Sequence, residues 1–557
     1  MLSHLDSHIT TTDPPSSSQP PFSDDVCHQI LKYLHWREII QTCTLLSTQF
    51  HNVISEHHLS ICIPRRKLTR HELHQIGSSC SLSKTTQLDI SGNSINDEGI
   101  LDLSHMKGLR VLNVAFNPIE KAQVVFEMFG GLREVDMRGI KVSRECVETI
   151  VKCESLRLEV FAFQSCDDGA DKLMACRAMQ HVTDLYTGAL SHTAVTALCE
   201  HLRLKKLKIY GIDNQMMKTI ASCENMSQLE TLVLLKNTLQ HEGILAIAQS
   251  EHLRKVTELN ISGCSPTLES LQELMSSDNV KLLKILQINN TQLGNDGFKA
   301  IVNSSNLGQL TGLEVHSCLI RQEGVKALSE SPFMSQLTQL RISANNIRDG
   351  VKYLSESLHV TKLHSLQLFG YPIGWEGMIQ LFSSENFQHL TDLSLTAITN
   401  DGVCTLVQSQ TLTKLRKLHL CKGLMDSNAC EMLASCENLR NLTFLELGSN
   451  PLGNEGVHHI VNSPFITQLV DLDLFSVSMD DEGVKSITQS DNLSQLEKLF
   501  LGQNGVTDVG AELLANAQNL KHLKGLHMGW NRMVSQKGRD MLFESAILKR
   551  CNVKFQN

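Results

Sequence analysis

A short apolar motif, L-x-x-L-x-L followed by a polar or small residue, recurs from about residue 85 to the end of the chain. Its central position holds Leu313, Leu340, Leu366 and Leu393 in four successive units, and most steps are 27 residues long. Towards the N-terminus the spacing falls to between 22 and 27 residues, and the unit near Leu158 is the least regular. Self-similarity at a fixed period is the signature of a repeat architecture. The pattern predicts about 19 repeats over residues 85–557.

Each repeat begins with a strand and a turn. In Leu340-Arg341-Ile342 two apolar side chains share one face of a short strand, and the arginine lies on the other. Five residues after the first strand leucine, many units carry Asn, Cys or Thr, which can hydrogen-bond buried backbone groups where the chain leaves the strand. These turn residues are Asn93, Asn117, Asn237, Cys264, Thr291, Cys318, Asn345, Asn450, Asn504 and Asn531.

A helix follows the turn in each repeat. Its start is marked by a glycine after an acidic residue, as in Glu323-Gly324, and apolar residues then return at helical spacing. Side-chain oxygens stand where an N-cap belongs, and carboxylates follow in the first turn, where the helix dipole favours them. The expected N-caps are Asn295, Asn400, Asn454, Asp481 and Asp508.

These strand–turn–helix units resemble the leucine-rich repeats of the ribonuclease-inhibitor-like class, and the resemblance covers about 470 residues. It implies an α/β leucine-rich-repeat solenoid, a curved horseshoe with a parallel inner sheet and outer helices. Curvature is expected because strands stack about 4.8 Å apart, whereas helices with their side chains are about 10 Å wide. Several units depart from the pattern at the turn position, which holds Ile140, Ile212, Tyr371, Ile398 or Val477.

The first 84 residues differ from the repeats in composition. Residues 1–21 are rich in Thr, Ser and Pro, so we expect a disordered tail. From Phe22 the chain turns apolar, and Val26, Ile30 and Leu34 fall at helical spacing, which predicts a small all-α segment over residues 22–60. Residues 61–84 are expected to form a linker or a cap before the repeats.

Residues 22–60 resemble the F-box, whose pattern opens with an apolar residue, Pro, an acidic residue and Val, and ends with small apolar and aromatic positions. Ser23 replaces the usual proline, and Phe50 stands where tryptophan is common. The same helices could instead be a plain cap that closes the first repeat. The resemblance implies these adaptor-binding residues: Phe22, Val26, Ile30, Leu31, Leu34, Ile39, Ile40 and Phe50.

Composition and motifs narrow the function classes. The formal charge of −9 argues against a general nucleic-acid binder. The chain begins without a secretory signal and lacks an apolar stretch long enough for a membrane span, so we expect a cytoplasmic or nuclear protein. Phosphate-binding, zinc-protease, nucleophile-elbow and paired zinc-ligand cysteine motifs are absent from the sequence. We therefore expect no enzyme activity, metal or cofactor, and 17 mostly buried, reduced cysteines.

The concave sheet is then the expected binding surface. Phe475, Phe500 and Trp530 come from three consecutive strands and should lie within about 10–15 Å of one another. Exposed aromatics on a rigid face are typical of a protein-binding hot spot, although they could simply pack together at the end of the solenoid. Acidic residues, including Glu446 and Asp473, share this face. The predicted partner-binding residues are Tyr210, His316, Arg341, Phe369, His419, Phe475, Phe500 and Trp530.

The combination resembles an F-box protein with leucine-rich repeats. That resemblance implies a non-enzymatic substrate receptor of a cullin-type (SCF-like) ubiquitin ligase, in which residues 22–60 bind a Skp-type adaptor and the concave face binds an unknown protein substrate. The alternative is a leucine-rich-repeat scaffold or sensor without a ligase. A third hypothesis, a small-GTPase regulator like the Ran GTPase-activating proteins of this repeat class, finds no matching acidic tail in the sequence.

Overall fold

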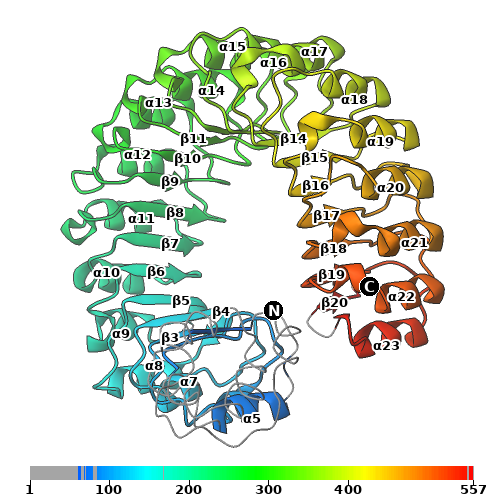
Figure 1. Ribbon diagram of the computed structural model, residues 1–557. Coiled ribbons are helices and arrows are strands. Elements are labelled where there is room, and N and C mark those ends of the chain that lie inside the picture. The colour runs from blue at the N-terminus through cyan, green and yellow to red at the C-terminus, as the bar shows by residue number, and fades with distance from the viewer. Residues whose placement is uncertain are drawn as a thin grey trace, which may run out of the picture.

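The computed structural model describes residues 60–63, 68, 70–78, 85–166, 168–548 and 551–555. Within them, a 20-stranded parallel sheet lines the inside of an open horseshoe, and helices form its outer layer (Figure 1). Each strand pairs with the next in the sequence, from β1 with β2 to β19 with β20. The expected α/β leucine-rich-repeat solenoid is confirmed.

The strands are short. Their bounds are β1 (Ser60–Cys62), β2 (Gln87–Asp89), β3 (Val111–Asn113), β4 (Glu134–Val142), β5 (Val160–Cys166), β6 (Asp184–Thr187), β7 (Lys206–Tyr210), β8 (Thr231–Leu235), β9 (Glu258–Asn260), β10 (Ile285–Gln287), β11 (Gly312–Glu314), β12 (Gln339–Arg341), β13 (Ser365–Leu368), β14 (Asp392–Thr396), β15 (Lys417–Cys421), β16 (Phe444–Glu446), β17 (Asp471–Asp473), β18 (Lys498–Phe500), β19 (Gly525–His527) and β20 (Asn552–Lys554).

The outer helices are α5 (Arg70–Ser78), α6 (Asp97–Leu101), α7 (Gln123–Met128), α8 (Arg144–Lys152), α9 (Ala170–Ala175), α10 (His192–His201), α11 (Asn214–Ala221), α12 (His241–Gln249), α13 (Leu268–Ser276), α14 (Gly294–Val302), α15 (Gln322–Glu330), α16 (Val351–Ser355), α17 (Trp375–Ser383), α18 (Asn400–Val407), α19 (Ser427–Ala434), α20 (Gly453–Val461), α21 (Asp481–Gln489), α22 (Asp508–Ala515) and α23 (Gln536–Glu544). Single 3₁₀ turns follow many of them: η4 (Arg177–Met179), η5 (Glu224–Met226), η6 (Asp278–Val280), η7 (Ser305–Leu307), η8 (Pro332–Met334), η10 (Glu385–Phe387), η11 (Glu437–Leu439), η12 (Asp491–Leu493) and η13 (Gln518–Leu520), while η9 (Arg348–Gly350) precedes α16.

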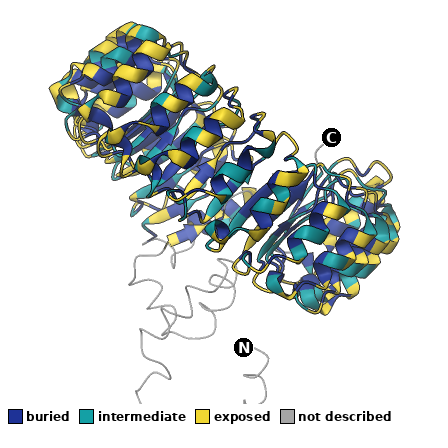
Figure 2. Cartoon of the chain, turned by 90° about the horizontal axis from the view of Figure 1, so that it is seen from above, coloured by how far each residue is buried: buried dark blue, intermediate teal, exposed yellow. Residues whose placement is uncertain are grey.

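One continuous apolar core runs between the sheet and the helices. The strand leucines align in register, as in Leu286, Leu313 and Leu340, and all three are fully buried. Helix residues such as Val325 and Leu328 pack against them, while exposed helix residues face solvent (Figure 2). Burial of one leucine contributes about 1.5–3 kcal/mol. Each repeat therefore depends on its neighbours for a buried face.

The structure corrects two details of the repeat pattern. The centre of β5 is Phe161, which pairs with Val135 and Leu185, so Leu158 is not the central residue of that unit. The sheet also begins earlier than residue 85, because β1 pairs with β2 through Ile61 and Leu88. The predicted tail (residues 1–21) and residues 22–59 of the F-box-like segment lie outside the described residues, as do all eight predicted adaptor-binding residues.

The turn residues join successive repeats, as their side-chain chemistry suggested. Asn345 is buried, and its Nδ2 donates to the carbonyl oxygens of Val315 (2.6 Å) and Ile342 (3.0 Å). Its Oδ1 accepts hydrogen bonds from the backbone N–H groups of Cys318 (2.9 Å) and Ile320 (3.0 Å). Such a side chain satisfies backbone groups that would otherwise be buried without partners.

The expected N-cap residues act on a different helix from the one predicted. Thr507 caps its own helix α22, whereas Asp481, in the first turn of α21, accepts from the N–H groups of Thr507 (2.9 Å) and Gly510 (3.0 Å). Asn454 bonds the start of α21 in the same way, through the N–H groups of Asp480 and Gly483. These side chains therefore tie the N-terminus of the next helix to the preceding one.

Replacing Asp481 by alanine is expected to lower the free energy of unfolding by about 1–2 kcal/mol, the usual cost of a lost helix cap. Asp481→Asn is the matched control, because asparagine makes the equivalent contacts at position 454. Urea unfolding followed by far-ultraviolet circular dichroism measures both. If both variants lost the same free energy of unfolding, the hydrogen bonds from Asp481 to the next repeat would not contribute to stability.

Candidate protein-binding face

The inner face of the sheet presents one side chain from between the two core positions of every strand. We call this set the central row, because strand pairing places its members side by side. In order from β1 to β20 it holds Cys62, Asp89, Asn113, Asp136, Ala162, Tyr186, Lys208, Val233, Asn260, Gln287, Glu314, Arg341, Gln367, Ser394, His419, Glu446, Asp473, Phe500, His527 and Lys554. With strands about 4.8 Å apart, neighbours in this row contact one another.

Four rings gather near the C-terminal end of this face, and we call Phe475, Phe500, His527 and Trp530 the aromatic patch. The ring centres of Phe475 and Trp530 lie 5.6 Å apart at a steep angle. The rings of Phe500 and His527 stack at 4.3 Å. Trp530 is 51% exposed, and both phenylalanines are only partly buried. The structure thus brings three predicted partner-binding residues into one surface.

A glycine makes room for the contact between Phe475 and Trp530. A Cβ atom on Gly502 would lie 2.9 Å from Cδ2 of Phe475, closer than van der Waals contact allows. Trp530 itself stands at the left-handed turn of its repeat, with φ of 59°. Other repeats place Gly211 or Ser317 at this turn, so the fold does not require a tryptophan there.

The histidine of the patch is uncharged at neutral pH. Burial lowers the pKa of His527 to about 4, and the nearby Lys554 and Lys498 act in the same direction. A neutral imidazole stacked on Phe500 extends the apolar surface rather than adding a positive charge.

Carboxylates lie beside the aromatic patch, and we call Glu446, Asp471 and Asp473 the acidic group. Glu446 accepts from Nδ1 of His419 at 2.6 Å, and Asp471 pairs with Lys498 at 3.2 Å. Asp473 accepts a backbone hydrogen bond from the N–H of Phe475 at 2.8 Å, and this is its only hydrogen bond within the described part of the chain. Burial, with help from the charges of Glu446 and Asp471, raises the pKa of Asp473 to about 6. Burial also raises the pKa of Asp471.

The other predicted residues fall into smaller groups. The rings of Phe369 and His419 meet edge to face at 5.8 Å, and His419 lies 4.4 Å from the ring of Phe444. Arg341 forms an ion pair with Glu314 at 3.1 Å. The backbone N–H of His316, half-buried after β11, donates to Asn289 at 2.8 Å. Arg341 and His316 therefore lie on the face without joining the aromatic patch.

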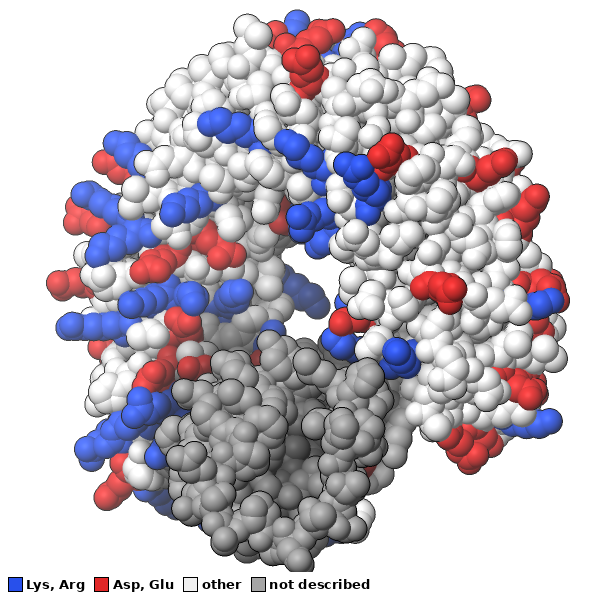
Figure 3. Space-filling view, in the orientation of Figure 1, with Lys and Arg blue, Asp and Glu red and all other residues white. Residues whose placement is uncertain are grey.

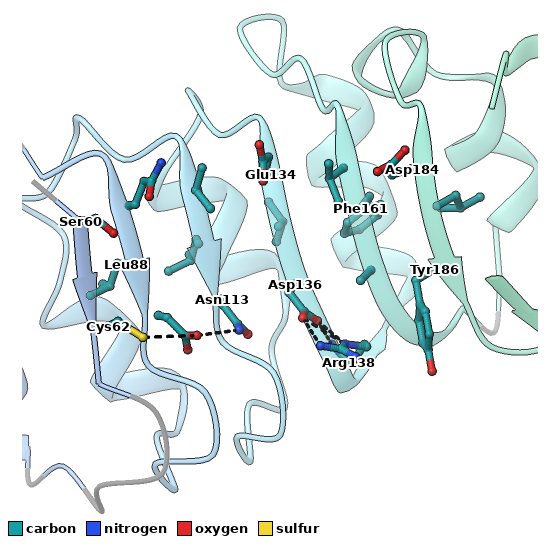
Figure 4. Close-up of a pocket in the computed structure, with 18 of the residues that line it drawn as sticks. Ser60, Cys62, Leu88, Asn113, Glu134, Asp136, Arg138, Phe161, Asp184 and Tyr186 are labelled. Carbon is teal, nitrogen blue, oxygen red and sulfur yellow. Dashed lines mark hydrogen bonds and ion pairs between the residues drawn. The ribbon is translucent and has the colours of Figure 1, made fainter. Parts of the chain in front are cut away.

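Tyr210 lies next to a second region, the N-terminal hollow, which is lined by Asp89, Asn113, Asp136, Arg138 and Tyr186 among others (Figure 4). This cavity has a volume of about 510 Å³. Arg138 pairs with Asp136 through Nε (3.0 Å) and Nη2 (2.7 Å), and its guanidinium lies 5.4 Å from the ring centre of Tyr186. The hydroxyl groups of Tyr186 and Tyr210 are 2.6 Å apart.

Sequence reasoning did not select Arg138, Tyr186 or Asp471. Tyr186 fills the central row in β6, and that signal was available in its position between two buried residues. Arg138 and Asp471 lie just outside the central position of their strands, so only the folded structure reveals their pairing.

On the flat side of the horseshoe that Figure 3 shows, Lys and Arg are interspersed among Asp and Glu. Among the described residues no His, Cys, Asp or Glu cluster is suited to a metal ion. No helix in that same part of the chain is long and apolar enough to cross a bilayer. The described cysteines form no disulfide with one another, and burial raises the pKa of Cys264 and of Cys430 to about 12, which keeps both protonated and unreactive.

The chain is similar to a family model and to several solved structures. A family model described as "Leucine Rich repeat" matches residues 86–104 and 438–459. An internalin from Listeria monocytogenes is 21% identical, over 70% of this chain and 94% of its own, with a TM-score of 0.38. A plant peptide hormone receptor, RGFR1 in complex with RGF2, is 15% identical, over 89% of this chain and 90% of the receptor, with a TM-score of 0.31. No curated protein matches the sequence. The chain therefore contains leucine-rich repeats.

Proposed function

We propose that this leucine-rich-repeat solenoid is a protein-interaction scaffold that binds its partner on the concave face. The aromatic patch is the observation that carries the proposal. Residues on a solvated sheet face are usually polar, yet Trp530 is 51% exposed beside the partly exposed Phe475 and Phe500. Rigidly held aromatic side chains, tryptophan and tyrosine above all, dominate the energetics of protein interfaces.

The layout of the face favours a large partner. The aromatic patch lies on β17 to β19 and the turns that follow them, whereas the N-terminal hollow lies on β1 to β7. Both belong to the same inner surface of the horseshoe (Figure 1). A ligand that contacts both regions must be a macromolecule.

Affinity purification with mass spectrometry tests the scaffold function. Proteins captured by the wild-type chain should be lost from a Phe475→Ala plus Trp530→Ala variant. The matched control is Trp375→Ala plus Val509→Ala, because both residues are exposed and lie on the outer helices α17 and α22. Partners lost equally from both variants, or retained by both, would contradict binding on the concave face.

The substrate-receptor function is the finer form of this proposal. Its support is the order of apolar positions over residues 22–50, which resembles the F-box. In that role the solenoid would hold a substrate near a ubiquitin carrier supplied by the cullin complex, which raises the effective concentration of substrate lysines. This function would place the protein in the cytoplasm or nucleus.

Adaptor pull-down separates the ligase receptor from a scaffold without a ligase. We expect a Skp-type adaptor to capture the wild-type chain and to lose it when Val26→Asp and Ile30→Asp are combined, because two carboxylates would enter an apolar interface. The same variant should keep its concave-face partners. Equal capture of both chains, or none of the wild type, would remove the ligase function and leave the scaffold.

A further inference from the structure

Resting on the proposed function, we propose that the aromatic patch and the acidic group together bind an arginine side chain presented by the protein partner. The site combines Phe475 and Trp530, from the turns after β17 and β19, as ring surfaces with Asp473 of β17 and Glu446 of β16 as carboxylates. A guanidinium suits this combination because it stacks on aromatic rings and donates hydrogen bonds to carboxylates at once.

The charge at this site is incompletely balanced by the chain itself. Glu446 accepts a hydrogen bond from His419, and Asp471 forms an ion pair with Lys498. Asp473 lies between Glu446 and Phe500 in the central row, and among the described residues it forms no salt bridge. Burial and the charges of Glu446 and Asp471 disfavour the ionised form of Asp473. A cation from a partner would favour that ionised form and would pair with the carboxylate.

An arginine side chain brings five N–H donors and no acceptor, so it suits a site whose side chains are carboxylates and aromatic rings.

The rings supply the other half of the site. Trp530 is half exposed and meets Phe475 at 5.6 Å, so its indole offers an exposed face to a planar cation. Asp473 accepts from the backbone N–H of Phe475 at 2.8 Å, which places a carboxylate next to the residue that carries the second ring. His527 does not repel such a cation, because its imidazole is neutral at pH 7. Lys498, a lysine beside the acidic group, is already engaged by Asp471.

The chain itself shows that the unpaired carboxylate is not needed for folding. Asn113 and Asn260 occupy the central row in β3 and β9, and each accepts the same backbone hydrogen bond that Asp473 makes, from Ala115 (3.1 Å) and Ser262 (2.9 Å). Asp473→Asn therefore keeps the local turn and removes only the charge. We expect it to raise the melting temperature at pH 7 while weakening binding, a combination typical of residues kept for function.

Phage display of random 12-residue peptides on the full-length chain tests the inference. Peptides are selected on the wild type and counter-selected on Trp530→Ala, so that only binders of the aromatic patch survive. We expect the survivors to carry arginine at one fixed position, and replacement of that arginine by citrulline, its neutral isostere, to weaken binding about tenfold.

Three variants then assign the arginine to its partner residues. Asp473→Asn should abolish the difference in affinity between the arginine and citrulline peptides, and Glu446→Gln should reduce this difference. Glu258→Gln, a carboxylate on β9 of the same sheet, should leave it unchanged. Survivors without an arginine preference, or no survivors, would overturn the inference. If peptides depend on Trp530 but not on arginine, the scaffold function stands and only the arginine site fails. A partner lost equally from outer-helix variants would instead overturn the scaffold function.

Discussion

Asn345→Ala is expected to lower the free energy of unfolding by about 3–5 kcal/mol, because each buried group left without a partner costs about 1–3 kcal/mol. Two carbonyl oxygens and two N–H groups in two neighbouring repeats lose their partners at once. Asn345 is only 3% exposed, so water cannot replace the lost side chain without opening the stack. The substitution should therefore destabilise the neighbouring repeats as well.

Urea unfolding, monitored by far-ultraviolet circular dichroism, measures this loss against two controls. Asn303→Ala removes an exposed asparagine at the end of α14 and should cost less than about 0.5 kcal/mol. The loss of unfolding free energy for Asn345→Thr should lie between those of Asn345→Ala and Asn303→Ala, because Thr291 occupies the same turn position two repeats earlier. An alanine variant as stable as Asn303→Ala would show that the turn residues do not join the repeats.

Trp530→Ala is expected to weaken binding of the purified partner by about 1–3 kcal/mol, or about 5-fold to 150-fold in Kd. The indole is half exposed in the free chain, and its contact with Phe475 holds one ring surface in place before the partner arrives. Little conformational entropy is then lost on binding. Isothermal titration calorimetry gives the affinity, and thermal unfolding gives the stability of the same variant.

The control for this prediction is Trp375→Ala. Trp375 has the same exposed fraction, 51%, but begins the outer helix α17. The Trp375→Ala variant should bind the partner with unchanged affinity. If Trp530→Ala keeps full affinity but lowers the melting temperature, the aromatic patch is packing at the end of the solenoid rather than a binding surface.

The repeat sequence predicts the sheet well because the strand leucines recur at nearly constant spacing and all face one core. It misleads near Leu158, which corresponds to the first leucine of L-x-x-L-x-L. Phe161 and Phe163 replace the next two leucines, and their rings pack 4.9 Å apart in the core. A motif written only in leucine therefore shifts the strand by three residues.

The bonds between repeats could not be assigned from local sequence. An N-cap pattern shows that an oxygen is available, but the stacking of repeats decides that Asp481 bonds the start of α22. A second set was missed although its signal was present. Ser250, Ser331 and Ser463 donate from their hydroxyls to carbonyls at the end of the helix in the preceding repeat (2.5 Å each), and similar serines recur in most repeats.

The side chains that line the inner face could be predicted from the sequence, whereas their role in binding stays a prediction. Alternation along each strand identifies which side chains share the inner face, so Phe475, Phe500 and Trp530 could be selected before their contacts were known. The burial that raises the pKa of Asp473 depends on neighbouring strands, and alternation does not show it. The same holds for the pairing of Arg138 with Asp136 and Tyr186.

Hydrogen–deuterium exchange of the full chain, with and without its captured partner, tests the concave-face assignment most directly. Binding there should protect the inner segments 473–477, 500–504 and 527–531, which carry the aromatic patch and Asp473. The outer helices α21 and α22 should exchange at unchanged rates. Protection confined to those helices, with the inner segments unaffected, would contradict the account.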